Sequence, residues 1–168
     1  MEAQKFLLEE LKSVYQIVKE QLVFAESKNA ALIAFNIAAI AIFFDKGVNV
    51  VAHVICPIGF IISCIISLSS FSPLSYSVKN ISKIDSDNFS LVYFRNIAAI
   101  TSDQYLEKIC QEIGVKTENL DTFPIASSYA QETTVLARIT VLKNRAFSLA
   151  MWTSIVFLVV AAIASCFN

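Results

Sequence analysis

Residues 147–167 read FSLAMWTSIVFLVVAAIASCF, a stretch with no charged side chain. A helix rises 1.5 Å per residue, so about 20 apolar residues cross the roughly 30 Å hydrocarbon core of a bilayer. This stretch has that length and that composition. It therefore predicts a membrane-spanning helix, and this prediction decides the fold class.

Two more apolar stretches lie in the first half of the chain. Residues 48–71 read VNVVAHVICPIGFIISCIISLSSF and are long enough to span a bilayer. Residues 30–44 read AALIAFNIAAIAIFF and extend over only about 22 Å, so this span needs residues 22–25 or a locally thinner bilayer. The sequence at 45–47 predicts a tight turn between them. We therefore expect an all-α integral membrane protein with three transmembrane helices, the first two forming a hairpin.

The composition of the whole chain agrees with this fold class. Of 168 residues, 56% are hydrophobic and 16% are charged, whereas soluble domains carry about 25% charged residues. This composition excludes an ordinary cytosolic enzyme, a disordered tail and a disulfide-stapled secreted domain. The formal net charge of −1 argues against nucleic acid as a partner, because phosphate binding requires a basic excess.

The positive charges predict the orientation in the membrane. All Lys and Arg residues except Lys46 lie in residues 1–29 and 72–146, and the positive-inside rule places both regions in the cytoplasm. We therefore expect a multi-pass protein with a cytoplasmic N-terminus. Its predicted organisation is a cytoplasmic amphipathic helix (1–29), a transmembrane hairpin (30–71), a cytoplasmic loop with helices (72–146), and a last transmembrane helix (147–168).

The first cytoplasmic region is predicted to be helical. Apolar residues recur every three or four positions along residues 2–28, which is typical of an amphipathic helix. No helix breaker separates this helix from the first span, so the two are expected to form one long rod. Further along, Thr101 or Ser102 is expected to cap a short helix over residues 103–113 that ends at Gly114.

The last helix is expected to begin at Pro124 and, having no breaker, to continue into the last span. The first and last helices then descend in parallel into the bilayer and pack on each other. Residues 72–101 are expected to be irregular, with at most a short strand or helical turn. Their apolar part, residues 88–94, is expected to pack under the cytoplasmic helices rather than face water.

Residue types that carry catalysis are scarce. The four cysteines lack a CxxC spacing and are interpreted as small apolar core residues, and the single histidine, His53, lacks co-ligands for a metal. With 3 Gly residues the chain cannot build a phosphate-cradling loop, and it contains no GxSxG or HExxH motif. We therefore expect no enzyme activity, no metal and no cofactor.

Two residues inside the spans stand out. Asn36 lies in the middle of the first span, where a buried amide needs a hydrogen-bonding partner on another helix. We interpret it as a contact that holds helices or subunits together. Pro57 frees a carbonyl group in the second span and favours a structural kink.

Charged residues flank the spans on the cytoplasmic side. Glu26 and Lys28 precede the first span, and Lys143 and Arg145 precede the third, so parallel helices place all four at one depth. They either anchor the helices or form a pocket for an anion just above the bilayer. Arg binds phosphate through paired hydrogen bonds, and an aromatic ring stacks on a base. The residues predicted to line such a pocket are Lys28, Tyr93, Phe94, Arg95, Arg138 and Lys143.

Three blocks of sequence resemble one known family. Residues 25–30 (AESKNA) lead into a span that contains Asn36, residues 88–97 (NFSLVYFRNI) are followed by SDQYL at 102–106, and residues 129–145 lead into the last span. In this order and around these spans, the blocks resemble the Pycsar effector transmembrane family over almost the whole chain.

The resemblance implies a function that composition alone does not give. Such proteins are antiphage effectors of the bacterial inner membrane, each paired with a cyclase that makes a cyclic pyrimidine mononucleotide (cUMP or cCMP) on infection. The messenger activates the effector, which disrupts the membrane and causes growth arrest or cell death. Because one chain with three spans encloses little space, we expect a homo-oligomer. On this hypothesis Lys28, Arg95, Arg138 or Lys143 contacts the phosphate, and Tyr93 or Phe94 contacts the base.

A second hypothesis comes from a different class. A non-catalytic membrane scaffold would recruit a cytosolic partner through the helical rods and would bind no small molecule. The apolar stripe of residues 2–28 fits this hypothesis equally well. An ion-selective channel is disfavoured, because the spans lack an acidic ring or a filter-like run.

Overall fold

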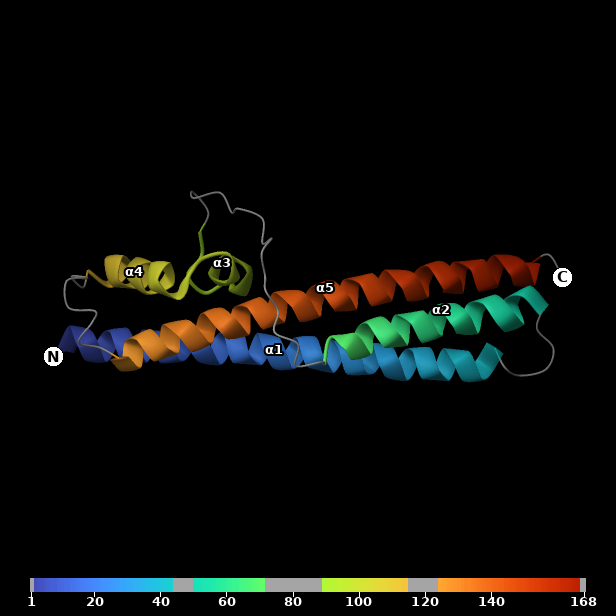
Figure 1. The fold of residues 1–168 in the computed structure, drawn as a ribbon, viewed down its shortest axis with the longest axis horizontal. Helices are drawn as coiled ribbons and strands as arrows, with labels where there is room; N and C mark the ends of the chain where they lie inside the picture. The colour runs from blue at the N-terminus through green and yellow to red at the C-terminus, as the bar shows by residue number, and fades with distance from the viewer. Residues whose placement is uncertain (1, 44–49, 72–88, 115–123, 167–168) are drawn as a thin grey trace. The chain divides into compact units, whose positions relative to one another are not determined.

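The computed structural model describes residues 2–43, 50–71, 89–114 and 124–166. The regular elements in these ranges are all helices, which confirms the all-α prediction (Figure 1). In chain order they are α1 (Glu2–Phe43), α2 (Val50–Ser69), α3 (Phe94–Ala98), α4 (Ser102–Ile113) and α5 (Pro124–Cys166).

The chain divides into two compact units, which we call unit 1 and unit 2. Unit 1 comprises residues 1–23 and 75–141, and unit 2 comprises residues 24–74 and 142–168. Both α1 and α5 contribute one part of their length to each unit. As expected from the absence of helix breakers, each of these two helices is continuous.

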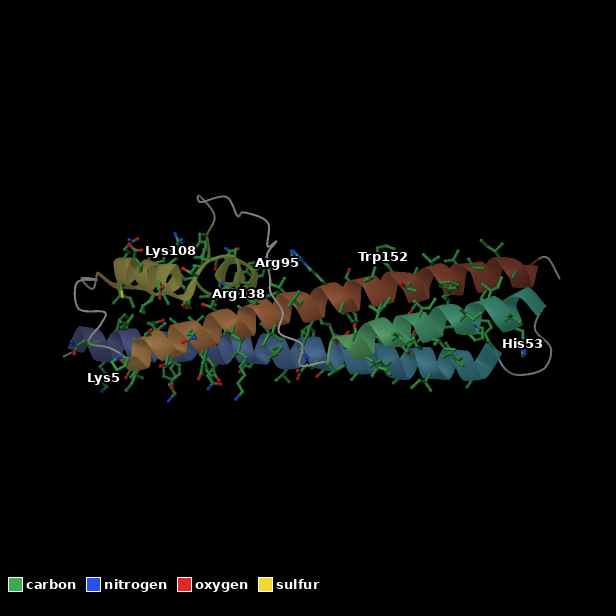
Figure 2. The ribbon with its side chains drawn as sticks, viewed as in Figure 1. Lys5, His53, Arg95, Lys108, Arg138 and Trp152 are labelled. Atoms are coloured by element: carbon green, nitrogen blue, oxygen red, sulfur yellow. The ribbon has the colours of Figure 1, made fainter. Side chains whose placement is uncertain are left out.

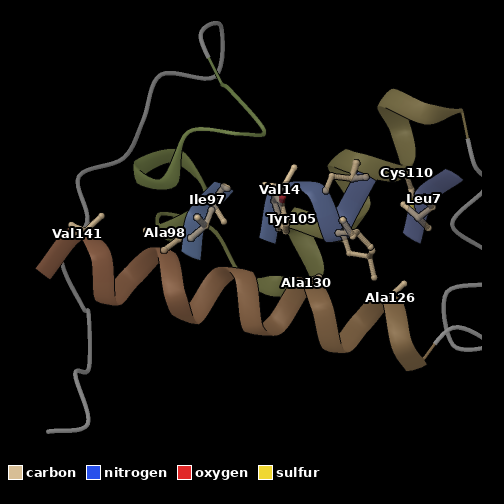
Figure 3. Packing of buried hydrophobic residues seen from close by; sticks show 14 residues of the cluster. Leu7, Val14, Ile97, Ala98, Tyr105, Cys110, Ala126, Ala130 and Val141 are labelled. Carbon is tan, nitrogen blue, oxygen red and sulfur yellow. The ribbon is translucent and has the colours of Figure 1, made fainter. Parts of the chain in front are cut away.

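Unit 1 has an apolar core built by four helices. The stripe predicted on residues 2–28 is buried there, with Leu11 and Val18 fully inaccessible to solvent. Figure 3 shows Leu7 and Val14 of α1 beside Cys110 and Tyr105 of α4, with Ala126 and Ala130 of α5 along one side. The buried members of this core are Leu7, Leu11, Val14, Val18, Ile97, Ala98, Tyr105, Leu106, Ile109, Cys110, Ala126, Ala130, Ala137 and Val141.

Gly114 ends α4 as predicted. Of the two predicted caps, Thr101 is the one observed, and the helix begins at Ser102, one residue before the predicted start. The Thr101 hydroxyl accepts a hydrogen bond from the backbone N–H of Gln104 at 3.3 Å, and the Gln104 side chain accepts one from the Thr101 N–H at 3.1 Å. This reciprocal pair satisfies donors that the first turn leaves unpaired. Gly114 ends the helix with φ of 74°, a left-handed conformation that glycine adopts without strain.

The region before α4 differs partly from its prediction. Residues 94–98 form the short helix α3, because Ile97 and Ala98 turn into the core of unit 1. Leu91 and Phe94 pack against that core as expected. Val92 and Tyr93 do not, since their side chains are 45% and 46% exposed. Residues 72–88 of the predicted loop lie outside the described part of the chain.

Unit 2 is a bundle of three helices. Asn36 and Glu26 of α1 bond to Ser154 and Lys143 of α5, so these two helices are parallel neighbours, as expected. The α2 helix runs antiparallel to both, as the colour gradient in Figure 1 shows. Its Pro57 lies inside the helix. A small apolar cluster of Ala39, Cys56, Phe60 and Ala161 lies in the interior.

Among the residues that the structure describes, two helices are long and apolar enough to cross a membrane: Gln4–Phe43 and Pro124–Ala164. A third apolar segment, His53–Ser69 in α2, is shorter. The count of three spans therefore stays a prediction. The turn predicted at residues 45–47 lies outside the described residues.

Candidate functional site

A layer of polar residues crosses unit 2 near the start of its α1 and α5 segments. Lys143 Nζ lies 2.9 Å from Glu26 Oε1, and the Asn29 amide donates a hydrogen bond to the Lys143 carbonyl oxygen at 3.3 Å. Lys28 Nζ donates to Asn144 Oδ1 at 2.8 Å. Three of the four charged residues predicted to group beside the spans, Glu26, Lys28 and Lys143, thus lie in this layer, and each has a partner.

Aromatic rings hold the two lysine ammonium groups of this layer. Lys28 Nζ lies 4.7 Å from the centre of the Phe24 ring and 5.1 Å from that of Phe147. Lys143 Nζ lies 4.8 Å from the centre of the Phe71 ring. A cation is attracted to the face of an aromatic ring, so each ammonium group has favourable partners despite its reduced contact with water.

Three of the predicted ligand residues lie together in unit 1. Tyr93 precedes α3, and its ring centre lies 5.1 Å from that of Phe94. Tyr93 is 46% exposed, and the next residue along α3, Arg95, is also exposed. Figure 2 marks Arg95 on α3 and Arg138 on α5. This short segment offers an aromatic surface beside a cation.

Arg138 has a clear structural role that sequence reasoning missed. Its Nε donates to the carbonyl oxygen of Ala98 at 3.3 Å, and its Nη2 donates to that of Ile100 at 2.9 Å. These are carbonyl groups that the end of α3 leaves unpaired. Arg138 therefore anchors α3 to α5 within unit 1. No periodicity in the sequence indicates this contact, because it links positions about 40 residues apart.

Hollows in unit 1 are lined by other residues than the six predicted ones. One of about 450 Å³ lies among Phe6, Glu10, Val14, Leu91, Val92, Ile109, Glu112 and Ile113. Another of about 380 Å³ is lined by Phe89, Leu91, Lys108, Gln111 and Glu112. A third, of about 600 Å³, is lined by Tyr15, Ser128, Gln131, Glu132, Val135 and Leu136. Their volumes fall in the range of small-molecule sites.

A hydrogen-bonded ring lies inside unit 2, with one residue from each helix. Asn36 Nδ2 donates to Ser63 Oγ at 2.8 Å, the Ser63 and Ser154 hydroxyl oxygens are 2.8 Å apart, and Ser154 Oγ donates to Asn36 Oδ1 at 2.8 Å. The sequence identified Asn36 but not the two serines. We call these three residues the polar ring. It confirms that Asn36 holds helices together.

Burial keeps the titratable groups in the core of unit 1 neutral. It raises the pKa of the Tyr105 hydroxyl and that of the Cys110 thiol above their usual values. The Tyr105 hydroxyl donates to the Leu91 carbonyl oxygen at 3.3 Å. Within the described ranges, no group of three His, Cys, Asp or Glu side chains is placed to hold a metal ion.

Comparison with known proteins identifies the family. No curated protein and no solved structure matches the chain. A family model described as the Pycsar effector protein domain matches residues 10–168, which is nearly the whole chain. This is a family of effectors rather than a known family of catalysts. The chain therefore belongs to the Pycsar effector family, and this membership makes it an antiphage defence effector.

Proposed function

We propose that this effector is activated by a cyclic pyrimidine mononucleotide and then disrupts the integrity of the bacterial inner membrane. A partner cyclase supplies the messenger during infection. The observation that carries this proposal is the inverted polarity of unit 2, because most of its large apolar side chains face outward while Asn29, Asn36, Ser63 and Ser154 are buried. Among those that face outward are Phe35, Ile37, Ile65, Leu149 and Trp152, each at least 50% exposed.

This inversion is what a lipid environment requires. Apolar side chains on the outside of a soluble protein would be costly in water, whereas lipid tails solvate them. In the proposal, the unit 2 parts of α1, α2 and α5 cross the inner membrane as three spans. The N-terminus and the charged surface of unit 1 face the cytoplasm, where the messenger is made.

The messenger presents one phosphate charge and one flat base. On unit 1, we assign the base to Tyr93 and Phe94 and the phosphate to Arg95, because stacking and paired hydrogen bonds suit these groups. Arg138 keeps donors beyond the two that hold α3 and is assigned a supporting phosphate contact.

The phosphate contacts predicted for Lys28 and Lys143 belong to unit 2, and they are considered apart from the site assigned on unit 1. A phosphate competes more easily for Lys28 than for Lys143, because Lys28 is bonded to the neutral Asn144 amide and Lys143 to the Glu26 carboxylate. Removing either lysine from its partner perturbs the polar layer of unit 2. Several copies act together, since three spans enclose little space.

Dye release from liposomes of inner-membrane lipids tests this function. Purified full-length protein is expected to release dye when cUMP or cCMP is added, and linear UMP or CMP serves as the control. Arg95→Gln is expected to weaken the response about tenfold, whereas the exposed Lys12→Gln leaves it unchanged. Absence of release with every cyclic nucleotide would contradict the proposal.

A scaffold function remains the second candidate, and one observation favours it. The hollow of about 450 Å³ in unit 1 is mostly apolar, and Phe6 at its edge is 50% exposed. A cytosolic partner protein could cover this surface without any small molecule. Calorimetry separates the two functions: heat on addition of a cyclic but not a linear nucleotide supports the effector, and no heat with either supports the scaffold.

A further inference from the structure

The interior of unit 2 contains a second polar level besides the polar ring. Asn29 and Ser67 are both fully buried. The Asn29 amide nitrogen donates to the carbonyl oxygens of Ala25 and Lys143 at 3.0 and 3.3 Å. Asn29 Oδ1 and Ser67 Oγ, however, have no hydrogen-bond partner among the described residues. Buried polar atoms left in this state are rare and costly in native proteins.

The two unpartnered atoms lie at nearly the same level of the bundle. The contact between Asn36 and Ser63 fixes the register of the antiparallel helices α1 and α2. On α1, Asn29 lies two helical turns before Asn36. The residue of α2 at the same height is Ser70, which lies about one turn after Ser67. The two side chains are therefore within about one helical turn, or roughly 5 Å, in height.

Water is the ligand that suits these two atoms. Asn29 Oδ1 can only accept a hydrogen bond, so the bridging species must donate to it. Ser67 Oγ can donate or accept, and water satisfies both atoms in either case. An anion would be repelled by the amide oxygen. A cation is disfavoured because the Lys143 ammonium group belongs to the same layer. Polar internal cavities in proteins are normally occupied by water.

At the polar ring, by contrast, the side chains leave no hydrogen-bonding atom for water. Every side-chain nitrogen and oxygen of Asn36, Ser63 and Ser154 has a partner. Ser63 Oγ accepts from the Asn36 amide and donates to the Ala150 carbonyl oxygen at 2.8 Å, and Ser154 Oγ donates to Asn36 Oδ1. Beyond the ring, the interior becomes apolar at Phe60, which is fully buried and stacks on Phe43 with ring centres 5.9 Å apart. An apolar constriction blocks ions by excluding water.

We propose that unit 2 binds internal water at Asn29 and Ser67, and that the polar ring with Phe60 is the gate through which water and small ions pass in the active state. The first part stands on the two unpartnered atoms alone. The second part rests on the proposed membrane-disrupting function, including the action of several copies together. Because three spans enclose little space, the route opens only when the helices of the bundle separate at the polar ring in the active assembly.

The water site is tested first, without any messenger. Water-edited solid-state NMR of the full-length protein in bilayers is expected to show water contact at the Asn29 side-chain amide and none at the Asn36 amide. Ser67→Ala is expected to abolish the contact at Asn29. Thr153→Val is the matched control, since the Thr153 hydroxyl bonds to its own helix at Leu149. A dry Asn29 in the unsubstituted protein would overturn the water site.

The gate is tested by proton and potassium flux into liposomes. Ser154→Ala opens the ring, and its basal flux is expected to rise about fivefold, the factor that corresponds to one lost hydrogen bond. Phe60→Ala is expected to raise it further, and Thr153→Val to leave it unchanged. Equal basal flux in all four proteins would overturn the gate. If the messenger changes the flux in none of the four proteins, the proposed function is contradicted. The water site and the differences in basal flux are not affected by that result.

Discussion

Units 1 and 2 are built from the same two long helices and have opposite polarity. In unit 1 the buried stripe of α1 is apolar, as at Leu11 and Val18, and charged residues such as Lys12 face outward. In unit 2 the same stripe carries Asn29 and Asn36, and apolar residues face outward. Figure 2 illustrates this with Lys5 and Lys108 labelled on unit 1 and Trp152 on unit 2. The spacing of the stripe thus indicates which face of a helix is buried. The types of residue in the stripe indicate which solvent surrounds the helix.

On the membrane placement proposed for unit 2, the two units are stabilised by different forces. Burial of apolar side chains from water stabilises unit 1. In a lipid environment that force is absent, so unit 2 depends on hydrogen bonds and on close packing of small residues. Gly59 shows how close this packing is, because a Cβ atom there would collide with the ring of Phe157.

The largest expected effect comes from emptying the core of unit 1. Leu11→Ala removes a fully buried side chain and is expected to lower the free energy of unfolding of unit 1 by about 2–5 kcal/mol. Hydrogen exchange of the α4 amides measures this loss. Lys12→Ala, one residue away and exposed, is the control. Equal exchange in both variants would remove the basis for an apolar core in this unit.

A smaller but still large effect is expected from crowding unit 2. Gly59→Ala forces the Phe157 ring or the α2 backbone to move, at a cost of about 1–3 kcal/mol. Thermal unfolding in detergent or bilayers measures it. Ile58→Ala, at a neighbouring position 52% exposed, is expected to have little effect. The comparison fails if the exposed position proves the more sensitive one.

An intermediate effect is expected at the start of α4 in unit 1. Thr101→Ala removes the hydroxyl that accepts from the Gln104 N–H, and about 1 kcal/mol of stability is expected to be lost. Thr101→Ser keeps the acceptor and is expected to retain most of the stability. Hydrogen exchange in the first turn of α4 distinguishes the variants. An unchanged first turn in Thr101→Ala would show that packing alone holds this helix.

The smallest effect is expected for the ion pair of unit 2. Glu26→Gln keeps an acceptor for Lys143 but removes the charge, and the expected loss is below about 1 kcal/mol, because Glu26 is 41% exposed and therefore partly screened. Its thermal unfolding is compared with that of Glu20→Gln, an exposed residue of unit 1. A loss as large as that from Gly59→Ala would mean that charge, rather than packing, holds the bundle together.

Local signals in the sequence predicted the helices and their ends. The stripe of α1, the cap at Thr101 and the stop at Gly114 each depend on neighbours in the chain, so their prediction was reliable. The contacts of Arg138 and of the serines in the polar ring could not be predicted in this way, because they depend on residues far away in the chain. A serine in an apolar run carries the same local signal whether it faces lipid or a partner, and only the register of three helices brings Ser63 and Ser154 to Asn36.

The chain contains a single tryptophan, and it lies on the outer surface of α5 with 60% of its side chain exposed. Its intrinsic fluorescence therefore reports on one face of one helix, without any introduced label. Brominated acyl chains that quench at known depths would locate Trp152 within the bilayer. A change in that depth when a nucleotide is added would reveal directly whether activation shifts this helix.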